Sequence, residues 1–244
     1  MTQETELLTA LEPFFDRELI SEVLYVVKSG KEATVYCCKA HPATGLDLLA
    51  AKIYRPRENR GFSKDTVYQQ GRMLDKRLSR AAANRSRAGV AAQFASWIDH
   101  EYETLHLLYS AGADLPRPLA QVGRAMLMEF VGDRQSAALP LSRVTLSRDE
   151  ARPLFRRLLH NIELWLACDR VHGDLSPYNI LYWEGNLKVI DFPQAVHPQI
   201  NPHSYELLLR DVENVCSYWQ RYGLQAHPRR ITDDLWVHYQ FGEL

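Results

Sequence analysis

Hydrophobic positions run continuously or alternate in the first half of the chain and recur at helical spacing in the second half. The first pattern predicts strands, because its runs are rich in β-branched and aromatic residues and end at Gly or Pro turns. We expect strands at 23–27, 34–39, 46–54, 119–122, 125–130 and 189–192, and helices at 7–21, 91–111, 154–168 and from His203 onward. Strands followed by helices indicate an α+β fold with two lobes.

The order of these elements suggests three segments. Residues 1–22 would form a helical extension, residues 23–130 an N-terminal lobe made of an antiparallel sheet plus a helix, and residues 131–244 a reduced, mainly helical C-terminal lobe. A hinge is expected near 129–133. A chain of 244 residues can bury a core without a disulfide or a structural metal.

Composition narrows the class of protein. Hydrophobic residues make up 46% of the chain and charged residues 24%, which is typical of a soluble globular protein. No stretch approaches the roughly 18 apolar residues of a membrane helix, so we expect no membrane partner. The cysteines lack C-x-x-C spacing and indicate reduced thiols in a cytoplasmic protein: Cys37, Cys38, Cys168 and Cys216.

Charge is distributed unevenly. The chain has a net charge of −1, but the segment from Arg55 to Arg87 carries +7 and the remainder −8. The basic loop 55–90 is therefore a candidate for contacting nucleic-acid phosphates, although few aromatic residues interleave the charges. A solvated loop without a partner is the alternative interpretation.

The most informative motif lies near the end of the predicted helical region. His172-Gly-Asp174 is followed by Asn179 and then by Ile190-Asp191-Phe192. Protein kinases have the same order of a catalytic Asp, a metal-binding Asn, a strand and a second metal-binding Asp. Phosphoryl transfer requires hard oxygen ligands for Mg²⁺, which Asn179 and Asp191 can supply, while Asp174 can orient the attacking hydroxyl. We expect His172 to pack and donate hydrogen bonds rather than act as a general base.

A lysine in the predicted third strand completes this chemistry. Lys52 lies in the apolar run Ala50-Ala-Lys-Ile-Tyr54, where a kinase places its phosphate-binding lysine. A buried lysine requires a partner. Helical spacing puts Glu101 on the buried side of its helix, so Glu101 is the first candidate and Glu103 the second.

The glycine-rich loop of a kinase is only partly present. The corresponding run is Lys28-Ser-Gly-Lys-Glu-Ala-Thr-Val35, in which Gly30 alone keeps a glycine. The run is no Walker A loop either, because Glu32 stands where Ser or Thr is needed. Its backbone amides could still bind phosphates.

Taken together, these motifs resemble the RIO family of atypical serine/threonine kinases. The phosphate loop, the long insertion between Lys52 and Glu101, the run Met128-Glu-Phe-Val-Gly132 and both catalytic loops carry the resemblance, from about Val23 to Trp219. It implies a two-lobed protein-kinase-like fold that transfers the γ-phosphate of ATP to serine, including its own, or acts as a slow ATPase through phosphorylation of Asp191. It also implies contacts with the small ribosomal subunit.

The resemblance assigns roles residue by residue. Lys52, Asp174 and Asp191 would be catalytic, and Asn179 and Asp191 would bind Mg²⁺, with Mn²⁺ as an alternative. The residues expected to contact ATP are Ser29, Gly30, Lys31, Glu32, Val35, Lys52, Glu101, Met128, Glu129, Val131 and Ser176. Ser63 and Ser79 are candidate autophosphorylation sites.

Three departures from ordinary kinases limit the substrate. Gly173 replaces the arginine of H-R-D, Pro193 replaces the glycine of D-F-G, and only 53 residues follow Asp191, without an A-P-E motif. A full lobe for peptide substrates therefore does not fit. Two alternatives stay open: a small-molecule phosphotransferase of the aminoglycoside or choline kinase type, which shares H-G-D and I-D-F, and an ATP-binding assembly module.

Overall fold

The computed structural model describes residues 8–55 and 87–244, which divide into two compact units. The first unit contains residues 8–55, 87–102 and 116–137, and the second contains 103–115 and 138–244. Most of the basic loop 55–90, with Ser63 and Ser79, lies outside the described residues. Within the described part of the chain, no helix is long and apolar enough to cross a membrane.

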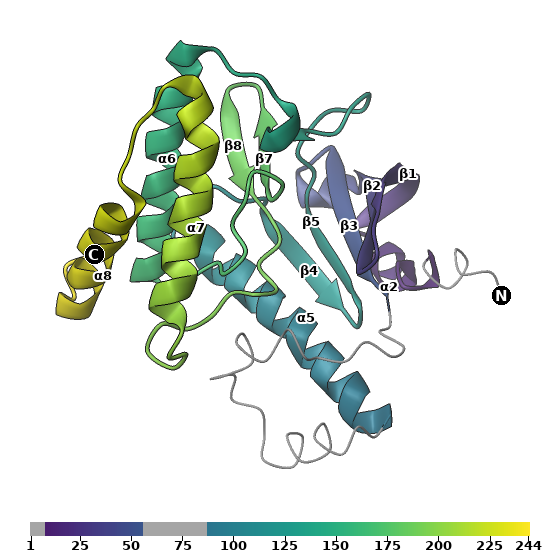
Figure 1. The fold of residues 1–244 in the computed structure, drawn as a ribbon. Helices are drawn as coiled ribbons and strands as arrows, with labels where there is room; N and C mark the ends of the chain where they lie inside the picture. Colours follow the sequence, from purple (N-terminus) through teal and green to yellow (C-terminus); the bar gives the residue numbers. More distant parts are fainter. Residues whose placement is uncertain (1–7, 56–86) are drawn as a thin grey trace. The chain divides into compact units, whose positions relative to one another are not determined.

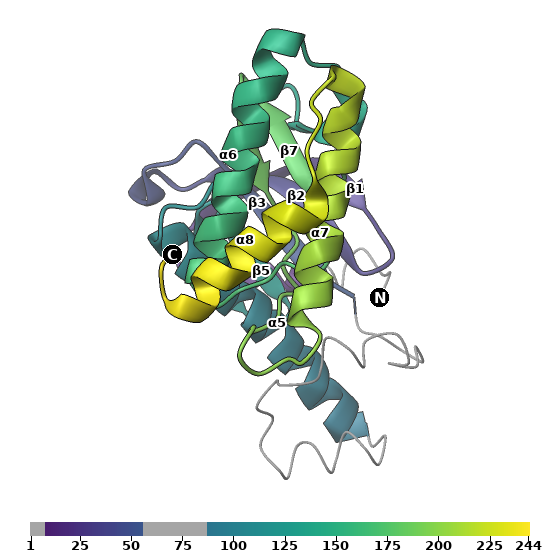
Figure 2. The ribbon, with the colours of Figure 1, turned by 60° about the vertical axis from the view of Figure 1, so that its left-hand side comes forward.

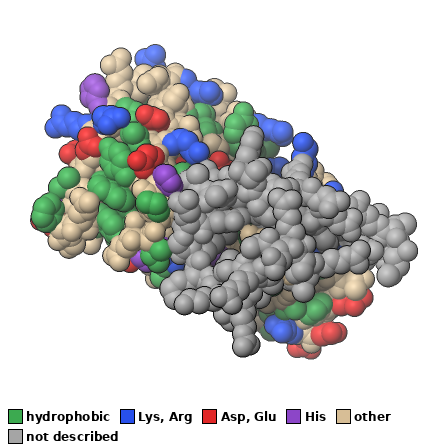
Figure 3. All heavy atoms as spheres, turned by 60° about the horizontal axis from the view of Figure 1, so that its bottom comes forward, with side chains coloured by type: hydrophobic (Ala, Val, Ile, Leu, Met, Phe, Trp, Pro, Cys, Tyr) green, Lys and Arg blue, Asp and Glu red, His purple; other side chains and the backbone are tan. Residues whose placement is uncertain are grey.

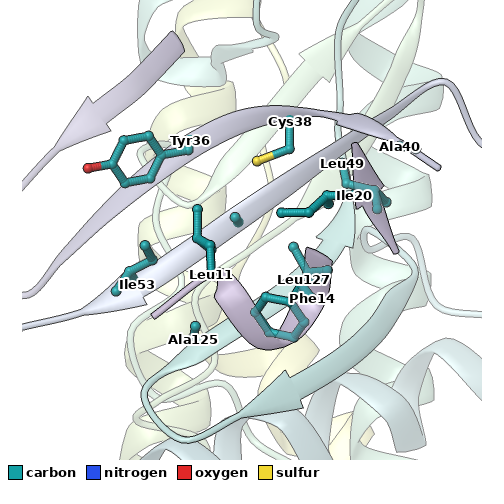
Figure 4. Close-up of a cluster of buried hydrophobic side chains, with 11 residues drawn as sticks. Leu11, Phe14, Ile20, Tyr36, Cys38, Ala40, Leu49, Ile53, Ala125 and Leu127 are labelled. Carbon is teal, nitrogen blue, oxygen red and sulfur yellow. The ribbon is translucent and has the colours of Figure 1, made fainter. Parts of the chain in front are cut away.

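The first unit is built on a five-stranded antiparallel sheet in the order β1-β2-β3-β5-β4 (Figure 1). Its elements are α2 (Glu12–Asp16), β1 (Ile20–Ser29), β2 (Ala33–Ala40), β3 (Leu48–Tyr54), β4 (Pro118–Val122), β5 (Ala125–Glu129) and the first part of α5 (Arg87–Ser110). All seven residues of β3 are buried, as expected of a central strand with both faces covered. One face packs on the N-terminal segment, where Leu11 and Phe14 contact Ile20, Leu49 and Leu127 (Figure 4).

The second unit combines helices with a three-stranded sheet in the order β6-β7-β8. Its further elements are β6 (Leu139–Pro140), α6 (Arg148–Ala167), β7 (Ile180–Trp183), β8 (Asn186–Val189), α7 (Ser204–Trp219) and α8 (Pro228–Phe241). A capping box between Ser147 and Glu150 starts α6. Helix α8 crosses the surface formed by α6 and α7 (Figure 2). The free cysteines agree with the expected thiols, and burial raises the pKa of Cys38 to about 12.

Two expectations about elements were wrong. In the segment expected to be a helix at 7–21, the structure describes residues 8–9 and the five residues of α2 as helical. The helix does not continue to residue 21, because Glu18 takes a left-handed backbone conformation (φ 53°) and β1 already begins at Ile20. The strand expected at 189–192 instead ends at Val189, and the strand β7 was missed. β7 and β8 form a hairpin around Glu184 and Gly185, both at positive φ, the conformation that two-residue hairpin turns require.

Candidate active site

The first unit contains a buried ion pair. Lys52 on β3 places its Nζ atom 2.8 Å from Oε1 of Glu101 on α5, and their side chains are 11% and 1% exposed. Glu103 is exposed, so the expected pairing with Glu101 is confirmed. A charge pair this deep is costly to desolvate unless its geometry is good and its remaining atoms are hydrogen-bonded.

Aromatic residues complete the surroundings of this pair. The hydroxyl of Tyr54 donates a short hydrogen bond to Oε2 of Glu101, and Lys52 Nζ lies 4.9 Å from the Tyr54 ring centroid. Burial, followed by the Glu101 carboxylate, raises the pKa of Tyr54 well above its ordinary value, so the phenol stays protonated. Trp97 and Phe94 contact the Tyr54 ring edge-on. Glu101 is therefore held by two donors. Tyr54 was not among the predicted site residues, although its place two residues after Lys52 puts both side chains on one face of β3.

The expected phosphate loop is the turn between β1 and β2. Gly30 begins it, and its N–H donates to the carbonyl of Ala33 (2.9 Å). Lys31 and Glu32 are exposed at the tip, and Val35 pairs with Lys52 across the sheet. Gly30 does not have a positive φ, and a Cβ there would meet only ordinary contact at 3.4 Å. The turn therefore does not require glycine for its own backbone.

The segment after β5 contains the expected adenine-binding groups. Met128 is buried, and the Glu129 N–H donates to the carbonyl of Arg117 (2.8 Å). Gly132 has φ 136°, and a Cβ there would lie 2.4 Å from the carbonyl of Ser136, so only glycine fits this turn. Glu129 and Val131 are the residues whose backbone groups are expected to face adenine.

The second unit contains the catalytic-loop motif between α6 and β7. Asp174 is exposed, and its N–H donates to Nδ1 of His172 (3.2 Å). Nδ1 of the imidazole is thus an acceptor, its proton lies on Nε2, and that atom is 3.3 Å from the carbonyl of Ile190. Burial lowers the pKa of His172 to about 4, so the ring is neutral at physiological pH. His172 links the catalytic loop to the residue before Asp191, as a hydrogen-bonding residue should.

Asp211 on α7 anchors the same loop and was not predicted as a site residue. Its carboxylate accepts hydrogen bonds from the backbone amides of Gly173 (2.7 Å) and Leu175 (2.9 Å), on either side of Asp174. The Arg210 guanidinium donates to the carbonyl of Gly173. Burial raises the pKa of Asp211 to about 7, while the two amides lower it. The backbone carrying Asp174 is therefore held on both sides from a helix some 36 to 38 residues later.

The β7–β8 hairpin brings Asn179 next to Asp191. Ile180 pairs with Val189, and the N–H of Ile190 donates to the carbonyl of Asn179 (2.9 Å). Asp191 has φ 65°, a strained conformation for a residue with a side chain, and such strain concentrates at functional sites. Ser176 lies in the turn that leads to Asn179, where the Ser176 carbonyl accepts a hydrogen bond from the Asn179 N–H.

Asn179 and Asp191 suit a divalent cation whose coordination is completed by a bound ligand. Nδ2 of Asn179 donates to the carbonyl of Asp174 (2.9 Å), which leaves its Oδ1 atom as the end available to a cation. Asn179 and Asp191 supply the carboxylate and amide oxygens that Mg²⁺ prefers. Among residues 8–55 and 87–244, no group of three His, Cys, Asp or Glu side chains could hold a metal. Two side-chain oxygens leave the other positions around Mg²⁺ to phosphate and water oxygens, which Mg²⁺ commonly keeps in its coordination shell.

A second cluster holds the strand that leads to Asp191. Asp114 accepts from Nε and Nη2 of Arg157 and from Nδ2 of Asn161, and its carbonyl accepts from the Val189 N–H (2.8 Å). Partial burial raises the pKa of Asp114, but the hydrogen bonds from Arg157 and Asn161 outweigh it and leave the pKa below its ordinary value. The cluster sets the end of β8, two residues before Asp191.

Comparison with solved structures defines the class of fold. The Rio2 kinase from Chaetomium thermophilum, solved as an ADP/Mg²⁺-phosphoaspartate complex, aligns with a TM-score of 0.68 over 92% of this chain and 64% of that one, at 22% sequence identity. A second structure of the Rio2 kinase from the same organism aligns equally well over 96% of this chain. The chain therefore has the expected two-lobed, protein-kinase-like α+β fold.

The chain belongs to the RIO family. The RIO domain matches residues 34–231. Serine/threonine-protein kinase RIO1 of Chaetomium thermophilum is 32% identical over 231 residues, which cover 89% of this chain and 43% of that protein. The RIO-type serine/threonine-protein kinase Rio1 of Haloferax volcanii is 32% identical over 82% of this chain and 64% of its own length. The chain thus spans less than two thirds of these relatives.

Proposed function

We propose that this chain is an ATP- and Mg²⁺-dependent phosphotransferase that transfers the γ-phosphate to serine or threonine hydroxyls, its own included. The observation that carries this proposal is the grouping of Asp174, Asn179 and Asp191 at one end of the β7–β8 hairpin, by a hydrogen bond from the Asn179 side chain to the Asp174 carbonyl and one from the Ile190 N–H to the Asn179 carbonyl. The names of the relatives, all serine/threonine-protein kinases, support it. The family match does not favour the aminoglycoside or choline kinase alternative.

Each residue has a defined task in this mechanism. Mg²⁺, when bound, neutralises charge on the phosphates. Asn179 and Asp191 offer it their side-chain oxygens. The exposed carboxylate of Asp174 accepts a hydrogen bond from the attacking hydroxyl and orients it for in-line displacement. Lys52 binds phosphate oxygens as a point charge whose position Glu101 sets.

ATP binding is assigned to the first unit. The amides of the turn from Ser29 to Glu32 would bind phosphates, and Val35 and Met128 would contact the adenine ring. The carbonyl of Glu129 and the amide of Val131 would form hydrogen bonds with the polar edge of adenine. Ser176 would assist at the phosphates from the catalytic loop.

A second output is ATP hydrolysis through Asp191. A carboxylate oxygen of Asp191 would attack the γ-phosphorus, the bond to the β-phosphate oxygen would break, and ADP would leave. Water would then hydrolyse the acyl phosphate to inorganic phosphate and restore the carboxylate. The phosphoaspartate in the Rio2 kinase complex motivates this proposal. Such a slow ATPase would serve as an assembly switch.

We propose the partners by chemical class. We propose a protein acceptor, with the chain itself as one, and contact between the basic segment 55–90 and rRNA phosphates. Such contact would weaken as salt rises, because each neutralised phosphate releases counterions. RNA titration at low and high salt measures it, and absence of binding at low salt would remove rRNA from the proposal. The four free thiols favour a reducing compartment, for which we propose the cytoplasm.

Labelled ATP tests the reaction. Wild type, Asp174→Ala and Asp191→Ala are incubated with γ-labelled ATP and Mg²⁺, while protein label and free phosphate are followed. Asp234→Ala on α8, whose carboxylate is exposed, is the matched control. We expect both signals in wild type and the control, and a fall of at least about 100-fold in the two active-site variants, the scale of an effect confined to the transition state. Activity that survives both substitutions would refute the proposal. Label that resists hydroxylamine would argue against phosphoaspartate.

A further inference from the structure

Arg55 contacts both ends of the turn between β1 and β2. Its Nη2 atom lies 2.6 Å from Oγ of Ser29, the last residue of β1, and 3.0 Å from Oγ1 of Thr34, the second residue of β2. Its backbone N–H donates to the carbonyl of Glu32 at the tip of the turn (2.8 Å). One residue thus bonds to the turn at three places, and we call Arg55, Ser29 and Thr34 the Arg55 clamp.

The clamp lies on the opposite face of the sheet from Lys52. Ser29 pairs with Thr34, and Thr34 pairs with Ile53, so these side chains share a face. Arg55 lies two residues beyond Ile53 and points the same way, whereas Lys52 points the other way. Arg55 therefore acts on the turn from the face of the sheet opposite Lys52, by holding the conformation of the turn.

The local environment indicates that this contact is specific. Thr34 is only 2% exposed, and Nε of Arg55 is buried without an acceptor among the residues that the structure describes. A buried donor without a partner is costly and calls for an explanation in a native structure. Two hydroxyl groups hold the guanidinium at this place despite that cost.

Phosphate binding by the turn gives a reason for such a clamp. Lys31 and Glu32 are exposed at the tip of the turn, and in the proposed function their amides converge on phosphate oxygens. Ordering a mobile turn on binding costs free energy, and a turn that is already ordered avoids this loss. Because ordering affects only the groups that bind phosphate, the benefit should grow with the number of phosphates on the ligand.

We propose that Arg55 is a positioning residue that pre-orders the β1–β2 turn for the phosphates of the nucleotide. The inference rests on the proposed function, since it assumes that the turn binds ATP. It adds a determinant outside the ATP-contacting residues: Arg55 favours nucleotides over nucleosides without touching either.

Calorimetry with ATP and with adenosine tests the proposal. Arg55→Met removes the donor, and the double variant Ser29→Ala/Thr34→Val removes the acceptors but keeps the charge. Arg230→Met, at an exposed arginine of α8, is the matched control. We expect both clamp variants to bind ATP about fivefold to tenfold more weakly, the scale of one typical lost hydrogen bond, and to bind adenosine unchanged. Amide exchange at Lys31 and Glu32 should quicken.

Four results would overturn the clamp. The first is ATP affinity unchanged in both variants, and the second is equal loss for ATP and adenosine, which would indicate general damage. The third is loss in Arg55→Met alone, which would make the charge rather than the hydrogen bonds responsible. If Arg55→Met does not fold, the double variant decides. The fourth is a wild-type chain that binds no ATP, which would overturn the proposed function as well.

Discussion

The two units hold their charged residues in different ways. In the first unit, Lys52 is buried and its charge is balanced by one carboxylate, Glu101. In the second unit, Asp174 lies exposed on the catalytic loop. Its backbone is fixed by hydrogen bonds from neighbouring amides to His172 and Asp211.

The difference follows from what each side chain must do. A lysine that binds phosphates from a dry site needs a counter-charge before the ligand arrives, because an unpaired buried charge is very costly. A carboxylate that orients a hydroxyl must instead present its oxygen atoms at a fixed place, which requires a rigid backbone.

On the described surface visible in Figure 3, Lys and Arg side chains lie among Asp and Glu side chains, so no large patch of one sign distinguishes that face.

The largest effect is expected where the ion pair is broken. Glu101→Leu leaves Lys52 buried without its partner and should lower the free energy of unfolding by about 3–5 kcal/mol. The triple variant Lys52→Met, Tyr54→Phe, Glu101→Leu should recover most of this stability but not ATP binding. Denaturant unfolding and calorimetry measure both. If the triple variant bound ATP normally, the pair would be structural alone.

The next effect tests the buried histidine through pH. The pKa of His172 is lowered to about 4 in the folded chain, whereas an unfolded histidine titrates near its model value of 6.5. The unfolded state therefore binds more protons between these values. The free energy of unfolding should fall by about 3 kcal/mol as the pH drops from about 6.5 to about 4, at 1.36 kcal/mol per pKa unit.

His172→Asn is the control for this pH dependence. The difference between wild type and variant isolates His172, because Asp211 contributes to both curves. Urea unfolding at intervals of pH gives the two curves. Parallel curves across the whole window would contradict a neutral, buried His172.

A smaller effect is expected where one backbone hydrogen bond is lost. Asp211→Asn keeps one acceptor and replaces the other with a donor, so the amide of Gly173 or Leu175 loses its partner. The free energy of unfolding at pH 7 should fall by about 1–3 kcal/mol. Phosphoryl transfer should fall through kcat, with the KM for ATP unchanged, because Asp174 is displaced while the ATP-binding residues are intact. A change in KM alone would contradict a role in positioning Asp174.

The smallest effect concerns the cluster around Asp114. Arg157→Met removes a pair whose arginine side chain is 52% exposed, so its contribution should stay below about 1 kcal/mol in thermal unfolding. Asn161 still holds Asp114 in this variant. A loss as large as that of Glu101→Leu would show that the position of β8 depends on Arg157 and would remove the contrast between exposed and buried pairs.

The sequence by itself determined the family and the fold class, and it singled out the residues to which we assign the chemistry. Asp174, Asn179, Asp191, Lys52 and Glu101 were predicted because each is a chemically distinctive residue at a spacing that phosphoryl transfer constrains. Most strands and the long helices followed from apolar periodicity, which burial imposes directly on the chain.

Only the tertiary structure decided what holds these residues in place. The side chains of Asp211, Asp114 and Arg55 form hydrogen bonds with partners 21 to 47 residues away in the sequence. The partners of Asp211 are backbone amides. Every residue has a backbone amide or carbonyl, so such a partner leaves no mark on residue type. The left-handed backbone at Glu18 and Asp191 could not be predicted from residue type either. The surrounding contacts impose this conformation against the local preference of these residues.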